Sequence, residues 1–202
     1  MSRQNILVYI KQLNRPVFTT SEIVALSGKS PSAITQSLNY LQKQGLIIKV
    51  HRGIWAESDK GVSPYSIIPF LTPRNRAYVS FVSALHLHGI IEQIPQVITL
   101  ASTSHTSIVH TKIGTFTIHQ IAPQFFKGFD WYRGEGSFLI AQPEKALVDS
   151  LYLSAHRNKQ FGFFPELSFP KEFSFARARK WVKSISNASV RLYVEKKLIE
   201  LS

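Results

Sequence analysis

The chain has 202 residues, which is enough for one large domain or two small ones. A hydrophobic content of 44%, with 14 phenylalanines, is ample for a packed core and argues against a disordered chain. Cysteine is absent, which excludes a disulfide framework and thiolate metal sites and is typical of a reducing compartment. Because no signal-peptide pattern and no apolar run of membrane-spanning length is found, we expect a soluble, cytoplasmic protein.

The formal net charge of +12 predicts an anionic partner. Residues 1–60 carry eight lysines and arginines against three acids, and residues 171–202 have the same balance. The intervening stretch, 61–170, is close to neutral with eight against six. A basic surface tuned only for solubility is the alternative, but the first excess coincides with a recognisable motif.

The chain opens with a predicted helix whose apolar residues have helical spacing: Ile6, Leu7, Ile10 and Leu13. A second helix is predicted from a capping box, because Thr19 and Glu22 have the S/T-x-x-E spacing. Phe18 and Ile23 are placed to act as its hydrophobic staple, and Gly28 stands where a helix ends.

Ser30 and Pro31 begin a third predicted helix, with serine as the N-cap and proline in the first turn. One stripe of this helix is apolar: Ile34, Leu38 and Leu41. Small polar residues lie away from that stripe: Ser32, Thr35, Gln36 and Asn39. Gly45 is expected to end the helix.

A β-hairpin is predicted next. Leu46 to Val50 forms its first strand, Gly53 lies in the turn, and Ile54 to Ala56 forms the return strand. Together with the three helices, this hairpin predicts a winged helix-turn-helix domain over residues 1–57.

Such a domain is typical of a DNA reader whose second motif helix enters the major groove. Gln36 and Asn39 can contact adenine, while Ser32 and Thr35 can meet bases or phosphates. The residues placed to meet backbone phosphate surround them: Lys29, Lys43, Lys49, His51 and Arg52. Arg52, at the wing tip, could instead enter the minor groove. A winged helix that binds only protein is the alternative, although no acid lies between Glu22 and Glu57.

After a polar stretch at 58–64, residues 65–202 predict a second, mixed α/β domain, of which 158–202 could be a separate helical extension. We therefore expect an α/β (α+β) protein in two parts. The predicted helices of the second part are 75–88, a helix from Pro143, 175–184 and 188–201. The predicted strands are 97–101, a hairpin of 107–110 with 116–121, and 138–141. The segment 161–165 is read as an aromatic loop.

Two clusters of polar residues could be interpreted as a metal site or a catalytic site, and a structural role is favoured for each. His86 and His88 would point to different sides of a helix, so we expect no shared metal ion. Glu144, Lys145 and Asp149 could be taken for a nuclease cluster, but the helix dipole and an i,i+4 pair explain them better. We predict no catalytic residue, no metal and no cofactor.

Two other segments are left open. Residues 125–132 contain five aromatics, which form either core or an exposed protein-binding surface. The C-terminal basic residues form either a solvated helix face or a second anion-binding patch: Arg177, Arg179, Lys180, Lys183, Arg191, Lys196 and Lys197.

Three segments in this order carry a family resemblance. They are His51-Arg52-Gly53-Ile54-Trp55, Ser83-Ala84-Leu85-His86-Leu87-His88-Gly89, and Ala141-Gln142-Pro143-Glu144-Lys145-Ala146-Leu147-Val148-Asp149-Ser150-Leu151-Tyr152. Over roughly residues 5 to 155, the chain resembles the AbiEi-like antitoxins of abortive-infection type IV toxin–antitoxin systems.

The resemblance implies a repressor of its own operon that binds inverted repeats in double-stranded DNA, with the family's wing and helix residues carried over onto Gln36, Asn39 and Arg52. It also implies that the second domain neutralises a nucleotidyltransferase-like toxin without a stable complex. Two copies on the operator are expected, as a dimer or as cooperating monomers. A stand-alone regulator without a toxin and a protein-interaction adaptor are the alternatives.

Overall fold

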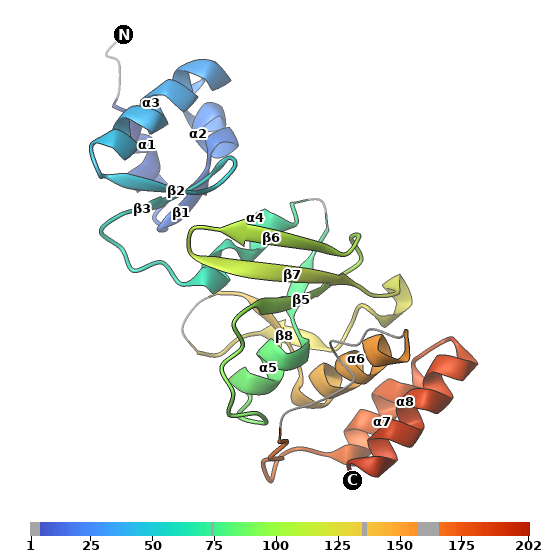
Figure 1. Cartoon of the computed structure of the whole chain (residues 1–202). Coiled ribbons are helices and arrows are strands. Elements are labelled where there is room, and N and C mark those ends of the chain that lie inside the picture. Colours follow the sequence, from blue (N-terminus) through green and yellow to red (C-terminus); the bar gives the residue numbers. More distant parts are fainter. Residues whose placement is uncertain (1–4, 74, 135–136, 157–165) are drawn as a thin grey trace. The chain divides into compact units, whose positions relative to one another are not determined.

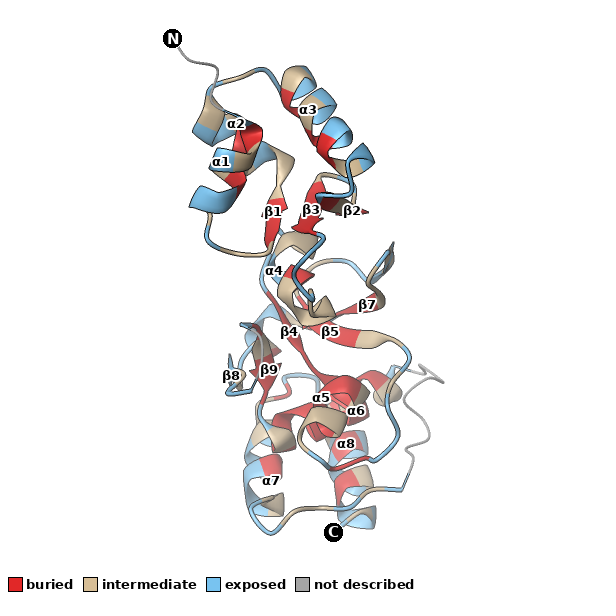
Figure 2. Ribbon diagram, turned by 90° about the vertical axis from the view of Figure 1, so that its left-hand side faces the viewer, coloured by how far each residue is buried: buried red, intermediate tan, exposed pale blue. Residues whose placement is uncertain are grey.

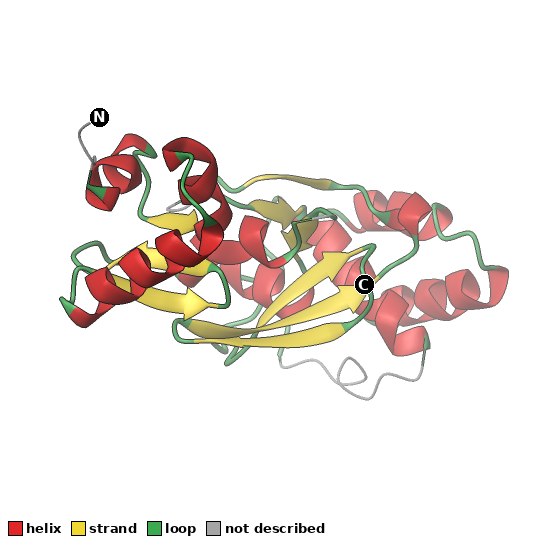
Figure 3. Ribbon diagram, turned by 90° about the horizontal axis from the view of Figure 1, so that it is seen from above, coloured by secondary structure: helices red, strands yellow, loops and turns green. Residues whose placement is uncertain are grey.

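The computed structural model describes residues 5–73, 75–134, 137–156 and 166–202. The chain divides into two compact units. Unit 1 comprises Met1–Leu71 together with His110–Gly114, and unit 2 comprises Thr72–Val109 together with Thr115–Ser202. Helices and strands occur in both, as Figure 3 shows, which confirms the predicted mixed α/β class.

Unit 1 is a winged helix-turn-helix (Figure 1). Its elements are α1 (Ile6–Gln12), β1 (Val17–Thr19), α2 (Thr20–Ser27), α3 (Pro31–Lys43), β2 (Ile47–His51) and β3 (Ile54–Glu57), followed by the 3-10 turn η1 (Pro64–Ile67) and the short α4 (Ile68–Leu71). The three strands form one antiparallel sheet in the order β1-β3-β2. Apolar residues of all three helices share one core with Phe18, Ile47 and Trp55.

The predicted helix boundaries in unit 1 are confirmed. The side chain of Thr19 accepts from the N–H of Glu22, and the Glu22 carboxylate accepts from the N–H of Thr19, which completes the capping box. Gly28 ends α2 in the left-handed region at φ 64°, where a side chain would be strained. Ser30 caps α3 through the N–H of Ala33, with Pro31 in the first turn.

Strand β1 is a feature that the sequence pattern did not predict. Phe18 lies opposite Trp55 in the β1–β3 ladder, so the residue interpreted as a helix staple also belongs to the sheet. The wing is fixed to the first turn of α2 by two further bonds: the N–H of Thr20 donates to the carbonyl of Gly53 at 3.0 Å, and Trp55 Nε1 donates to Thr20 Oγ1 at 2.9 Å. The wing is therefore bonded directly to the first turn of α2.

Unit 2 is built on a six-stranded mixed sheet in the order β6-β7-β5-β4-β9-β8. Its strands are β4 (Ala77–Val79), β5 (Ile98–Ser102), β6 (Ser107–Thr111), β7 (Gly114–Gln120), β8 (Phe129–Trp131) and β9 (Leu139–Ala141). Its helices are α5 (Phe81–Leu87), α6 (Pro143–Ala155), α7 (Phe175–Lys183) and α8 (Ala188–Glu200), with the 3-10 turn η2 (Pro123–Phe125). The β6–β7 hairpin and helices α6, α7 and α8 agree with the sequence prediction.

One predicted helix in unit 2 is wrong. The range 75–88 contains strand β4 and then helix α5, and only the second half is helical. Tyr78 and Val79 are fully buried because β4 pairs with β5 on one side and β9 on the other. Pairing on both sides outweighs the local helical preference, and the chain turns between the two elements at Phe81, whose φ is 57°.

Helix α6 is enclosed on all sides. It contacts α5, α7, α8 and strand β9, and every residue from Glu144 to Leu151 is buried. Figure 2 shows this helix almost entirely in the buried colour, unlike α7 and α8 beside it. The predicted aromatic loop at 161–165 lies outside the described residues. Within the described part of the chain, no helix has the length and apolar character needed to cross a membrane.

Candidate nucleic-acid interface

The polar face of α3 is exposed. Ile34, Leu38 and Leu41 are buried on one side of the helix, and the residues expected to read DNA lie on the other side, all exposed: Ser32, Thr35, Gln36, Asn39 and Lys43. Figure 2 shows these two sides of α3 in different colours. The structure thus places the five predicted side chains of this helix together on one accessible surface.

These side chains differ in the hydrogen-bonding capacity they offer. Thr35 Oγ1 donates to the carbonyl of Pro31 at 2.8 Å, and the hydroxyls of Ser32 and Ser30 share a hydrogen bond at 3.2 Å. The side-chain amides of Gln36 and Asn39 make no hydrogen bond to any residue that the structure describes. An uncommitted amide can donate to and accept from one base edge at once, so Gln36 and Asn39 are the best equipped for base contacts.

The wing places Arg52 at its tip. Arg52 is exposed, next to Gly53, whose φ of 75° forms the turn. His51 and Lys49 are half-buried on β2, and the Lys49 ammonium lies 5.5 Å from the centre of the Trp55 ring. Lys49 therefore lies against the sheet, and Arg52 is the exposed member of this group.

Of the three acids in unit 1, Glu22 and Glu57 are paired with cations, and Asp59 is exposed beyond the end of β3. Glu57 is buried and paired with Lys11 and with Lys60, whose ammonium lies 2.7 Å from the Glu57 carboxylate; Glu22 is paired with Arg15. Burial raises the pKa of Glu57, but the hydrogen bonds from Lys11 and Lys60 outweigh it and hold the pKa below its usual value.

The cations predicted to meet DNA have no such counter-charge. Lys29, Lys43, Lys49 and Arg52 have no carboxylate partner among the described residues. Because Glu22 and Glu57 are paired with other cations and no acid lies between them in the sequence, these carboxylates do not cancel the basic charge around α3 and the wing. The arrangement can attract a polyanion and present uncommitted amides to it.

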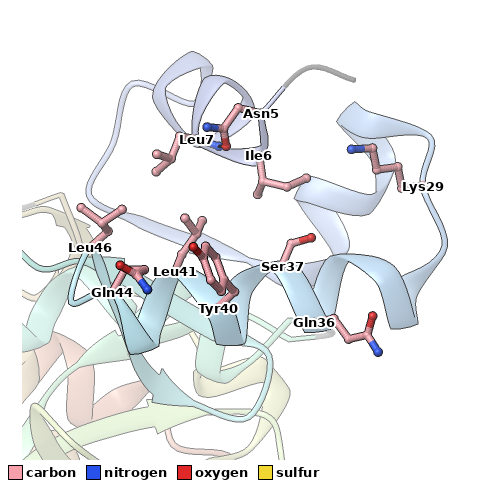
Figure 4. A pocket seen from close by; sticks show the side chains of 10 residues that line it. All are labelled: Asn5, Ile6, Leu7, Lys29, Gln36, Ser37, Tyr40, Leu41, Gln44 and Leu46. Carbon is pink, nitrogen blue, oxygen red and sulfur yellow. Dashed lines mark hydrogen bonds between the residues drawn. The ribbon is translucent and has the colours of Figure 1, made fainter. Parts of the chain in front are cut away.

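A groove runs between α1 and α3 beside the reading surface, with a volume of about 680 Å³ (Figure 4). We name it the α1–α3 groove and define it by its lining residues: Asn5, Ile6, Leu7, Lys29, Gln36, Ser37, Tyr40, Leu41, Gln44 and Leu46. Sequence reasoning missed this groove because it arises from the packing of two helices separated along the chain. The exposed Tyr40 on α3 was the one available signal.

In unit 2, the predicted Lys145–Asp149 pair forms, and it lies in the core. Lys145 Nζ donates to Asp149, and Tyr78 and Ser80 donate to the other carboxylate oxygen at 3.0 and 2.7 Å. Burial lowers the pKa of Lys145 and raises that of Asp149, while their mutual attraction opposes both effects. Both side chains are fully buried, so the geometry is that of a structural ion pair.

Glu144 also has a structural partner. Its Oε1 atom accepts from Arg177 Nη2 at 2.7 Å and Nε at 2.9 Å, and from the N–H of Ser174 at 2.9 Å. The carboxylate thus joins α6 to the start of α7. Of the C-terminal basic residues, Arg177 is accounted for by this contact.

The histidines do not assemble a metal site. His86 Nδ1 lies 3.3 Å from the carbonyl of Ile91, and His88 Nε2 lies 2.8 Å from that of Ala141, so the two side chains contact separate carbonyls. Among the described residues there is no group of three or more histidines and carboxylates able to hold an ion. His119 is buried on β7 against Phe81, and burial lowers its pKa to about 4.

Replacing His119 with leucine is expected to flatten the acid dependence of stability. Between the ordinary pKa of 6.5 and about 4, the unfolded chain binds a proton at this position that the native chain does not. The free energy of unfolding therefore falls as the pH drops through that window, by up to about 3 kcal/mol. Urea titrations at pH 7 and pH 4.5 would measure how much the free energy of unfolding falls between the two pH values. If it falls equally in the leucine variant and in the unsubstituted chain, His119 is excluded as the source of the pH dependence.

The fold of unit 1, its exposed reader helix and its basic wing define a winged helix-turn-helix domain of the DNA-binding regulator class. Residues 5–58 match the protein-family model described as a transcriptional regulator, AbiEi antitoxin. The match confirms the resemblance inferred from the sequence. It ends one residue after β3, the last strand of the wing. No curated protein matches the chain.

Proposed function

We propose that this protein is a transcriptional repressor that binds inverted-repeat operator DNA and acts as the antitoxin of a type IV toxin–antitoxin system. The observation that carries the DNA-binding role is the exposed polar face of α3 beside basic residues without carboxylate partners. On this proposal, Gln36 and Asn39 select the bases, Ser32 and Thr35 support them, and the surrounding basic residues and His51 hold the phosphates: Lys29, Lys43, Lys49, His51 and Arg52.

Replacing Arg52 with alanine is expected to weaken binding to operator and random DNA alike. Arg52 projects from the wing tip and contributes charge without reading a base, so its loss should reduce the slope of log K against log salt by about 1. Fluorescence-anisotropy titrations at several salt concentrations would measure this slope. Arg133→Ala is the matched control, because Arg133 is an exposed arginine of unit 2 outside the C-terminal basic set. An unchanged slope in the Arg52 variant would remove the wing from the interface.

On this proposal, unit 2 neutralises the toxin and unit 1 represses the operon. The match of residues 5–58 to the antitoxin-regulator family model supports this division, and the neighbouring reading frame would supply the nucleotidyltransferase-like toxin. No stable complex is required if the antitoxin acts on the toxin transiently.

Co-expression with that toxin from unrelated promoters is therefore expected to restore growth. The full-length chain carrying Gln36→Ala and Asn39→Ala should restore growth equally well, because neutralisation does not depend on reading DNA. Continued growth arrest, with both proteins shown to be folded and present, would leave a stand-alone regulator as the function. If the unsubstituted chain also fails to bind DNA, the stand-alone regulator would be excluded as well, and a protein-interaction adaptor would be the remaining function.

A further inference from the structure

We propose that the α1–α3 groove binds a small aromatic acid and that this ligand competes with DNA for the reader helix. The inference rests on the proposed DNA-binding function, because the competition involves two residues assigned to that interface. The ligand class follows from the shape, the lining and the charge of the groove.

The shape suits a small molecule. The volume of about 680 Å³ lies within the range of ligand sites, which is roughly 300–1,000 Å³. Ile6 and Leu41 are buried and form its floor. Figure 4 shows Leu7, Tyr40 and Leu46 around the same space, between α1 and α3.

The lining favours an aromatic body. Tyr40 is 62% exposed and Leu46 is 47% exposed, although both border an apolar floor. A flat apolar ligand would cover these side chains and the floor beneath them, and the phenol ring of Tyr40 offers a stacking surface. Exposed apolar surface of this kind next to polar amides is typical of a ligand site that is largely formed before binding.

The charge of the groove favours an anion. Lys29 is its one charged lining residue, and no carboxylate is among the lining residues. Lys29 has no carboxylate partner elsewhere among the described residues, so its ammonium can pair with an acidic group on the ligand. The amides of Gln36 and Gln44 also line the groove, at opposite ends of it, and Gln36 is the one on the side of Lys29 (Figure 4).

Competition follows from shared residues. Lys29 and Gln36 line the groove and also belong to the predicted DNA-contacting set. An acid paired with Lys29 removes one phosphate contact, and a ligand that engages the Gln36 amide removes a base reader. By thermodynamic linkage, bound DNA must lower the affinity for the ligand by the same factor by which the bound ligand lowers the affinity for DNA.

The probe for the test is anilinonaphthalene sulfonate, an aromatic acid whose fluorescence rises in an apolar site. The full-length chain is expected to bind it at one saturable site. Leu46→Glu places a negative charge at the groove and Tyr40→Ala removes the aromatic wall; each should weaken binding at least about tenfold, equivalent to about 1.4 kcal/mol. Leu192→Glu is the matched control, because Leu192 is 69% exposed on α8 and should leave the dye affinity unchanged.

The DNA arm uses the unsubstituted chain. Operator DNA should displace the dye, and saturating dye should weaken operator binding by the same factor. Absence of a saturable site, or equal loss of dye binding in the Leu192 variant, would overturn the site. Simultaneous binding of dye and DNA without mutual effect would overturn the competition. DNA binding measured without dye reports on the proposed function alone, so the two can fail separately.

Discussion

Replacing Lys145 with methionine is expected to destabilise unit 2 by about 3–5 kcal/mol, because the Asp149 carboxylate would remain in the core without its counter-charge. Tyr78 and Ser80 would still donate hydrogen bonds to that carboxylate, but neither neutralises it. The Lys145 ammonium also lies 3.8 Å from the centre of the Phe125 ring, so a favourable cation–π contact is lost as well.

Urea unfolding followed by circular dichroism would measure this effect. Lys197→Met is the matched control, since Lys197 pairs with Glu200 on the surface, and its loss should leave the urea midpoint nearly unchanged. Combining Lys145→Met with Asp149→Leu should recover much of the lost stability, because no buried charge is left unpaired. Equal losses in the Lys145 and Lys197 variants would contradict the buried ion pair.

The second large effect is expected at the reader helix. Gln36→Ala and Asn39→Ala should each cost about 1–3 kcal/mol at the operator and little on random DNA, because they remove base contacts and leave the phosphate contacts in place. Both side chains are exposed, so neither change should alter folding.

Operator and random-sequence duplexes titrated in parallel at one salt concentration would separate the two contributions. Tyr193→Ala on α8 provides an exposed control outside unit 1. If the two duplexes lose affinity equally in the Gln36 and Asn39 variants, these residues contribute only general attraction, and specificity must come from elsewhere on the surface.

The sequence predicted best those features that neighbouring residues determine. The capping box of Thr19 and Glu22, the left-handed stop at Gly28 and the Ser30 cap are each local hydrogen-bonding arrangements, and all three form as expected. The reading face of α3 follows from them, because the start of the helix and the buried stripe fix which residues face outward. The exposure of Gln36 and Asn39 could therefore be predicted without coordinates.

Of the four described strands that have three residues, β9 was predicted from the apolar run at 138–141, whereas β1, β4 and β8 were missed. A three-residue segment by itself carries little periodicity, and these three strands are defined by their pairing with other strands. The aromatic segment 125–132 illustrates the result: Phe125 is core, Phe129 stacks on Tyr78 at 4.5 Å, and Trp131 ends an edge strand with 58% of its surface exposed.

Burial of charge was the other feature that the sequence did not reveal. The i,i+4 spacing of Lys145 and Asp149 predicted their pairing, but the spacing is the same on a solvated helix as on an enclosed one. What distinguishes the two is the packing of α7 and α8 against α6, which no pattern within residues 143–155 encodes. The α1–α3 groove was missed for the same reason.

The contact between Glu144 and the start of α7 has a consequence for shortened forms of the protein. Proteolytic cleavage or a premature stop codon ahead of Ser174 would remove the guanidinium and the amide that satisfy a buried carboxylate. It would also uncover the apolar flank of α6. Such a truncation product would be exposed to degradation by cellular proteases. The cationic C-terminal helices are therefore part of the folding unit that contains α6, and they are not a dispensable tail.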